Sequence, residues 1–205
     1  MLLLILDYLG TFAFAVSGAL KGVRKGMDLF GVIVLALVTA IGGGTLRDAL
    51  LNQRPFWLGD QAYVLISLVA AGAVFVLFRL FARTERALLL FDAVGLGVFT
   101  AIGAMKAQAA DAGGLGMVTM AVMTGVGGGM MRDVLARDIP VVLREEIYAS
   151  ASIAGALVLW GFLALGLPET VAICAGTVLT VLIRILSILL KWKLPRRDPD
   201  SCRER

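Results

Sequence analysis

The stretch Gly42-Gly43-Gly44-Thr45-Leu46-Arg47-Asp48 lies inside a segment that otherwise has the composition of a membrane-spanning helix. A second copy, Gly127-Gly128-Gly129-Met130-Met131-Arg132-Asp133, follows 85 positions later. Adjacent glycines have low helix propensity and no side chains to pack, so each triplet predicts a helix that bends or opens. Backbone groups freed at such a point cannot face lipid. The two triplets therefore predict a hydrated passage inside the protein.

The composition around these motifs is that of an integral membrane protein. Of the 205 residues, 60% are hydrophobic and 17% are charged, and the mean hydropathy is +0.92. Soluble domains are about half apolar and about a quarter charged. The chain has no histidine and only two cysteines, Cys174 and Cys202. These counts argue against a zinc site, a disulfide framework and histidine-based catalysis, so we expect no metal, no cofactor and no enzymatic activity.

Seven apolar segments are each near the ~20 residues that a helix needs to cross the bilayer. They predict an all-α fold with transmembrane helices at 2–20, 29–46, 58–78, 87–105, 115–131, 141–166 and 169–190. We expect a single transmembrane domain over 1–190, followed by a basic tail at 191–205. The tail should lie on the cytoplasmic lipid surface and not on nucleic acid. The connections are short, so we expect no soluble domain, and we predict no soluble protein partner.

The chain also matches itself at the same offset of 85 residues, without a gap. The matched pairs are Asp7 and Asp92, Gly10 and Gly95, Phe14 and Phe99, Gly18 and Gly103, Lys21 and Lys106, Gly31 and Gly116, Pro55 and Pro140, and Tyr63 and Tyr148. The two halves, 1–82 and 86–166, hold three predicted spans each. An odd number of spans reverses the direction of the second half, which predicts a 3+3 inverted-topology repeat. A seventh helix, at 167–190, lies outside it.

The distribution of Lys and Arg predicts the orientation. On one side we place three basic residues in each of the loops after the first, third and fifth spans, and six in the tail; the other side has only Arg47, Arg54 and Lys106. Cytoplasmic loops carry the excess of basic residues. We therefore expect the N-terminus outside the cell membrane and the C-terminus in the cytoplasm.

The charged pairs after the triplets are the main candidate site. Arg47 and Asp48 lie toward one face and Arg132 and Asp133 toward the other, and a charge at membrane depth costs at least ~2.5 kcal/mol. Neighbours on a helix point about 100° apart, so each arginine is expected to find its partner on another helix or in water. The alternative is that the arginines only extend to the headgroups.

Other polar residues carry less weight. Hydroxyls and amines that might flank a pore are Ser17, Lys21, Thr39, Thr100, Lys106 and Thr124. Serine and threonine in membrane helices equally often bond their own backbone. Asp7 and Asp92 fit the favourable helix N-terminus as well as a functional role. Arg184 is expected to extend to the lipid surface.

The seven-span plan, the inverted repeat and the twin Gly-Gly-Gly-x-x-Arg-Asp motifs resemble the bacterial branch of the trimeric intracellular cation channel family, over roughly residues 5–190. The resemblance implies a homotrimer in the membrane, with a pore for monovalent cations, chiefly K⁺, in each protomer. The second and fifth helices, kinked at 42–44 and 127–129, would line that pore. Both Arg-Asp pairs would lie along it. The Lys-Glu-Val motif that animal members use for phosphoinositides is missing, since only Lys106 stands near that region.

Together with this resemblance, the residues lead us to expect passive permeation in which Arg47 or Arg132 crosses the passage to an acceptor on another helix and gates it. The alternative is a secondary transporter of a small amino acid such as glycine, because inverted repeats are common in carriers. The lack of an isolated carboxylate at mid-span argues against a coupled carrier.

Overall fold

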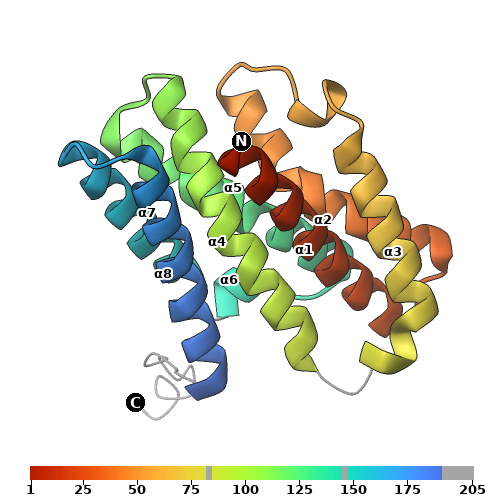
Figure 1. Ribbon diagram of the computed structural model, residues 1–205. Coiled ribbons are helices and arrows are strands. Elements are labelled where there is room, and N and C mark those ends of the chain that lie inside the picture. Colours follow the sequence, from red (N-terminus) through yellow and green to blue (C-terminus); the bar gives the residue numbers. More distant parts are fainter. Residues whose placement is uncertain (82–84, 145–146, 191–205) are drawn as a thin grey trace, which may run out of the picture.

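The computed structural model describes residues 1–81, 85–144 and 147–190, and within them every regular element is a helix (Figure 1). The helices are α1 Leu2–Arg24, α2 Leu29–Leu50, the 3₁₀ turn η1 Phe56–Leu58, α3 Ala62–Phe81, α4 Glu85–Ala109, α5 Gly113–Leu135, α6 Val141–Arg144, α7 Ala149–Ala164 and α8 Glu169–Leu190. The predicted basic tail at 191–205 lies outside the described residues.

Five of these helices, α1, α2, α4, α5 and α8, are long and apolar enough to cross a membrane. The chain is therefore an all-helical membrane protein. Shorter apolar stretches occur in α3 and α7, so the total of seven spans stays a prediction.

The prediction of one helix over 141–166 is wrong. The chain forms the single turn α6, and the main helix α7 begins at Ala149. The start of α6 is held by the end of α5, because the backbone N–H of Val141 donates a hydrogen bond of 3.0 Å to Asp133. The turn is thus part of a loop tied to α5.

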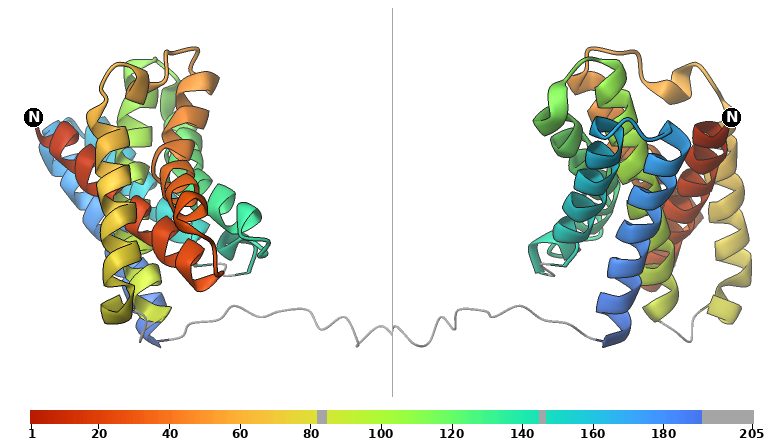
Figure 2. Two further views of the ribbon diagram at one scale, coloured as in Figure 1. Left: turned by 90° about the vertical axis from the view of Figure 1, so that its right-hand side faces the viewer. Right: turned by 60° about the vertical axis from the view of Figure 1, so that its left-hand side comes forward.

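Local structure recurs at the 85-residue offset. Backbones with positive φ occur at Asn52 and Arg137, with φ of 53° and 55°. The turn η1 begins at Phe56 and α6 begins 85 residues later, at Val141. The helices α1 and α4 run in opposite directions across the bundle (Figures 1 and 2). The two halves therefore share local structure and are placed antiparallel.

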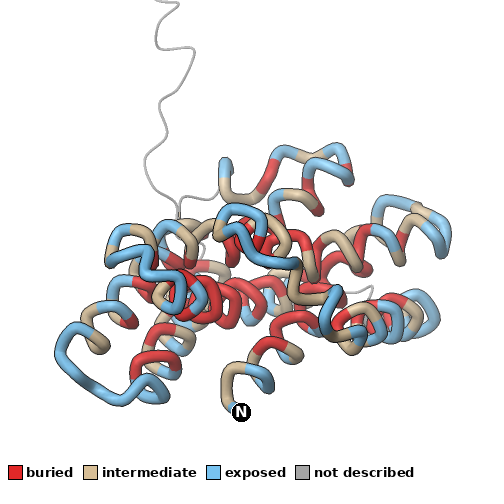
Figure 3. Tube along the Cα trace, turned by 90° about the horizontal axis from the view of Figure 1, so that it is seen from above, coloured by how far each residue is buried: buried red, intermediate tan, exposed pale blue. Residues whose placement is uncertain are grey.

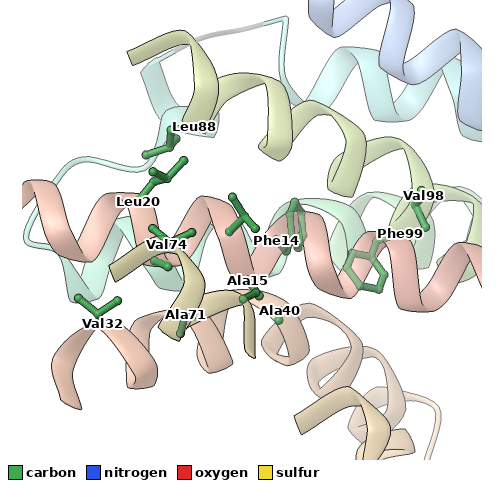
Figure 4. Packing of buried hydrophobic residues seen from close by; sticks show 14 of the residues in the cluster. Phe14, Ala15, Leu20, Val32, Ala40, Ala71, Val74, Leu88, Val98 and Phe99 are labelled. Carbon is green, nitrogen blue, oxygen red and sulfur yellow. The ribbon is translucent and has the colours of Figure 1, made fainter. Parts of the chain in front are cut away.

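The centre of the bundle is made by α1, α2, α4 and α5, which pack on one another (Figure 1). Helix α3 covers α1 and α2. Helices α7 and α8 cover α4. Seen from above, buried positions concentrate along the inner faces of these helices (Figure 3). The rings of Phe14 and Phe99, equivalent positions of the two halves, meet with centroids 5.1 Å apart (Figure 4). Gly95 leaves space for the Phe14 ring, since a Cβ there would lie 2.0 Å from it.

The helix ends gather at two faces of the bundle. The N-terminus, η1, the α4–α5 turn and the α7–α8 turn lie at one end, which we call the N-terminal face (Figures 1 and 2). The α1–α2 turn, α6 and the end of α8 lie at the other, which we call the C-terminal face.

Candidate functional site

The glycine triplets lie where α2 crosses α5. Both helices remain helical through the triplets, so the expected opening of the backbone is not found. A Cβ on Gly43 would lie 2.2 Å from the carbonyl oxygen of Thr124, and a Cβ on Gly128 would lie 2.2 Å from that of Thr39. Such short separations bring Cα–H groups against carbonyl oxygens, a weak attraction between helices. The triplets therefore let two backbones touch.

Arg132 lies at the centre of a buried polar cluster made by three helices. Its Nη1 donates to Ser17 Oγ of α1 at 2.6 Å and to Asp92 Oδ1 of α4 at 2.5 Å. Its Nε donates to Asp133 Oδ1 at 3.0 Å. The arginine is fully buried and both aspartates are 1% exposed. The guanidinium thus crosses from α5 to acceptors on α1 and α4.

Arg47 is equally buried, at 1% exposed, but it does not cross to another helix. Its Nε donates to Asp48 Oδ1 at 2.8 Å, and its Nη2 lies 2.7 Å from the same oxygen. The guanidinium carbon lies 5.5 Å from the centroid of the Phe56 ring, within the range of a cation–π contact. The expectation that each arginine finds its partner on another helix is therefore wrong for Arg47, which pairs with its own Asp48. The long side chain folds back far enough to reach it. The expectation holds for Arg132, which also bonds to Asp133.

The two motif aspartates have a second, structural role. Asp48 Oδ2 accepts the backbone N–H of Phe56 at 2.9 Å, just as Asp133 accepts that of Val141. Each aspartate therefore joins its arginine to the loop that follows the helix. The arrangement repeats in both halves.

Asp7 and Asp92 are buried polar residues that the sequence analysis left out of the site. Both lie beyond the first turn of their helices, which contradicts the simple dipole interpretation. Asp92 pairs with Arg132, whereas Asp7 accepts a hydrogen bond of 3.0 Å from Tyr63. No arginine or lysine of the described side chains lies within 4 Å of Asp7. The matching positions in the repeat, Asp with Tyr in each half, were the signal that could have found them.

At the C-terminal face, charged side chains join the α1–α2 turn to the loop after α5. Asp138 lies 2.7 Å from Lys21 Nζ and 2.6 Å from Lys25 Nζ, and Lys21 also lies 3.5 Å from Asp133. The hydrogen bonds from Lys21 and then Lys25 lower the pKa of Asp138 to about 2. Lys106, the counterpart of Lys21, is exposed, and no ion pair involves it among the described side chains. The two faces therefore differ in the ion pairs that these equivalent lysines make.

The remaining hydroxyl candidates bond to nearby groups. Thr39 and Thr124 are buried at the helix crossing and donate to carbonyl oxygens one turn back, at 2.6 Å each. Thr100 donates to Leu96 at 2.7 Å and contacts Ser152 at 2.7 Å. These three satisfy the backbone interpretation that the sequence left open.

The prediction that Arg184 reaches the lipid surface is wrong. Its side chain is 1% exposed, and its guanidinium carbon lies 4.9 Å from the centroid of the Tyr148 ring. Tyr148 in turn lies close to Asp92, because a Cβ on Gly129 would be 2.8 Å from its hydroxyl and 3.4 Å from the carboxylate. Helix α8 therefore adds the positive charge of Arg184 beside the Arg132 cluster. Because α8 lies outside the repeat, Arg184 has no equivalent residue in the first half.

Known proteins match this chain over nearly its whole length. A family described as "Glycine transporter" matches residues 4–79 and again 89–164, two segments that start 85 positions apart. The chain is 46% identical to the UPF0126 inner membrane protein YadS of Escherichia coli K12 over 198 residues, covering 95% of this chain and 96% of that protein. It is 43% identical to a UPF0126 membrane protein of Deinococcus radiodurans, covering 95% and 92%.

Solved structures agree with these sequence matches. A structure described under conductance through TRIC cation channels superposes with a TM-score of 0.87 at 40% identity, covering 95% of this chain and 96% of that one. The TRIC trimeric intracellular cation channel orthologue of Rhodobacter sphaeroides gives 0.86 at 39% identity, covering 93% and 99%. A channel from Caenorhabditis elegans shares the fold, at a TM-score of 0.63 and 12% identity over 91% and 90% of the chains. The chain therefore belongs to the UPF0126 family of bacterial membrane proteins and is a bacterial member of the TRIC channel family.

Proposed function

We propose that this protein is a cation channel, not an enzyme, and that it conducts K⁺ in preference to other ions through a path between α1, α2, α4 and α5 of each protomer. The observation that carries the proposal is the pair of buried arginine–aspartate clusters, one in each half, at the centre of apolar helices. Buried charge in a membrane protein is costly and marks ion pathways. The related channels of known structure, named for conductance of cations, support the same conclusion.

The channel is closed where α2 meets α5 in the conformation described here. Conduction requires Gly43 and Gly128 to move away from the carbonyl oxygens that they touch. The Cα–H contacts are weak, so the crossing is a contact that can part at modest cost. In this proposal α2 and α5 separate at the glycine triplets. The carbonyl oxygens of Thr39 and Thr124 that become exposed would replace part of the ion's hydration shell.

Arg132 is the gating arginine in this proposal. Its guanidinium crosses to Ser17 and Asp92, and it must leave one of these partners for a cation to pass. Asp48 and Asp133 offset the positive charge of the two arginines along the path. Lys21 and Lys106 flank the two ends.

We further propose a homotrimer in the bacterial inner membrane with the N-terminus outside and the tail in the cytoplasm. Trimers are named in the related channel structures, and an inner membrane location in the Escherichia coli relative. The excess of basic residues that the sequence has in the loops after the first, third and fifth predicted spans and in the tail supports the orientation. Lipids and permeant cations are the expected partners, with K⁺ as the permeant ion and no resident cofactor.

A secondary transporter of a small amino acid is the second candidate. Two observations favour it: the family description, and Asp7, a buried carboxylate without an ion-pair partner among the described side chains. The argument from a missing isolated carboxylate therefore no longer holds against a carrier. A carrier would use the two halves in alternation.

Planar-bilayer recording of the purified protein in asymmetric KCl separates these functions. A K⁺ channel gives unitary currents, with a reversal potential that follows the K⁺ gradient and shifts when Na⁺ replaces K⁺ on one side. Saturable glycine uptake into proteoliposomes without unitary currents would establish the carrier instead. Within the channel proposal, Arg132→Ala should change open probability, and unchanged open probability and selectivity in both Arg132→Ala and Arg47→Ala would remove the arginine gate.

A further inference from the structure

A pocket of about 650 Å³ opens at the N-terminal face between α1, α3, α4 and α8. Its polar lining includes Asp7, Tyr63, Lys106 and Glu169, and Ile102 and Met105 contribute apolar surface. Two carboxylates face one ammonium group, so the lining carries a net negative charge when all three are ionised. The pocket therefore favours a positively charged occupant.

The other half of the protein shows what occupies the equivalent place. The counterparts of Asp7 and Tyr63 at the 85-residue offset are Asp92 and Tyr148, and the counterpart of Ile102 is Ser17. There the space is filled by the guanidinium of Arg132, which bonds to both Asp92 and Ser17. The half built on the same plan thus holds an organic cation on its buried carboxylate.

In the first half the corresponding guanidinium is withdrawn. Arg47 is held by Asp48 and packs on Phe56, while among the described side chains Asp7 accepts its hydrogen bond from Tyr63. The serine hydroxyl that helps to hold Arg132 is replaced here by Ile102, which has no polar atom to offer. Arg47 therefore lacks the hydroxyl acceptor that Ser17 gives Arg132, and a pocket remains beside Asp7.

We propose that Asp7, with the Tyr63 hydroxyl, forms a binding site for a monovalent cation at the N-terminal face, and that the Arg47 guanidinium competes with that cation for Asp7. When Arg47 extends to Asp7, the pocket closes as it is closed around Arg132. When Arg47 folds back on Asp48, the site takes a cation from solution. The inference deepens the proposed cation conduction by naming the carboxylate where ions enter.

Guanidinium chloride at low millimolar concentration is the probe, because the second half already holds a guanidinium group on the equivalent carboxylate. Its affinity for the full-length protein in lipid nanodiscs is measured from the rise in thermal unfolding midpoint, with equal choline chloride as the reference. Wild type should be stabilised. Asp7→Asn should weaken guanidinium binding about tenfold or more, since a charge-assisted hydrogen bond is lost. Arg47→Gln should tighten it severalfold by removing the competitor.

Asp111→Asn is the matched control, because Asp111 is an exposed carboxylate at the same face that lies outside this pocket. It should leave guanidinium affinity unchanged. Equal guanidinium affinity in wild type and Asp7→Asn would overturn the site, and equal affinity in wild type and Arg47→Gln would overturn the competition. If guanidinium binding depends on Asp7 but the protein gives no unitary currents, the proposed cation site is supported and the proposed channel function is refuted. Normal K⁺ currents with guanidinium binding independent of Asp7 would do the reverse.

Discussion

Replacing Gly43 or Gly128 by alanine tests whether the triplets serve as a contact between α2 and α5. The new Cβ would lie 2.2 Å from a backbone carbonyl oxygen in each case, whereas ordinary contacts begin at 3.4 Å. A backbone atom cannot swing aside as a flexible side chain can, so the helices must separate by about 1 Å. Forced overpacking of this kind costs about 1–3 kcal/mol. Each variant should be less stable than wild type, and any population that still inserts should have a higher open probability.

Matched controls exist in the same bundle. Gly72 in α3 and Gly161 in α7 are helical glycines for which a Cβ would meet nothing within 4 Å. Alanine at these positions gains up to about 1 kcal/mol of helix propensity without a clash. Thermal unfolding of all four variants in one detergent gives the comparison, followed by bilayer recording of those that fold. If Gly43→Ala and Gly128→Ala unfold at the same temperature as the two controls, or above it, α2 and α5 do not touch at the triplets.

Three further outcomes follow from the charged clusters and the tail. Arg132→Ala should lower the free energy of unfolding by about 3–5 kcal/mol, because two carboxylates lose their buried cation. Arg47→Ala leaves only one carboxylate without its cation, so it should lower the free energy of unfolding by less. A larger loss of stability in Arg47→Ala, measured by thermal unfolding, would contradict this ranking. Asp138 has a lowered pKa, so its stabilising effect is complete above its unfolded pKa of 3.8 and is lost as pH falls toward about 2. The unfolding midpoint of Asp138→Asn should therefore fall less between pH 5 and pH 2.5 than that of wild type, and parallel curves would show that Lys21 and Lys25 do not hold this carboxylate. A green fluorescent protein fused to the C-terminus should fluoresce in bacterial cells and an alkaline phosphatase fusion there should be inactive, whereas the opposite pair of results would reverse the orientation.

The sequence predicted the architecture well because hydropathy and the repeat are properties of the chain itself. Apolar segments near the length of a span identified α1, α2, α4, α5 and α8 within a few residues. The 85-residue offset predicted two halves on one plan, and the positive-φ residues Asn52 and Arg137 lie 85 positions apart. The short helix α6 was less predictable, because the hydrogen bond from the Val141 N–H to Asp133 at its start is a tertiary contact that the apolar pattern does not reveal.

The site was found in part, for physical reasons. Charged residues in an apolar segment are costly, so Arg47 and Arg132 were recognisable as buried or functional without any structure. Their partners were not, because the reach of a guanidinium across a helix crossing depends on distances that only folding sets. The glycines were assigned to bends because composition shows a missing side chain but does not show which backbone fills the space, here the carbonyl groups of Thr39 and Thr124.

Helix α8 is the one long described helix outside the repeat, and it treats the two halves unequally. It supplies Glu169 to the pocket beside Asp7 at one end and Arg184 beside Tyr148 toward the other. An ion would thus meet an added negative charge on one side of the membrane and an added positive charge on the other. Such a molecule should rectify: outward and inward currents at equal and opposite voltages should differ even in identical salt solutions.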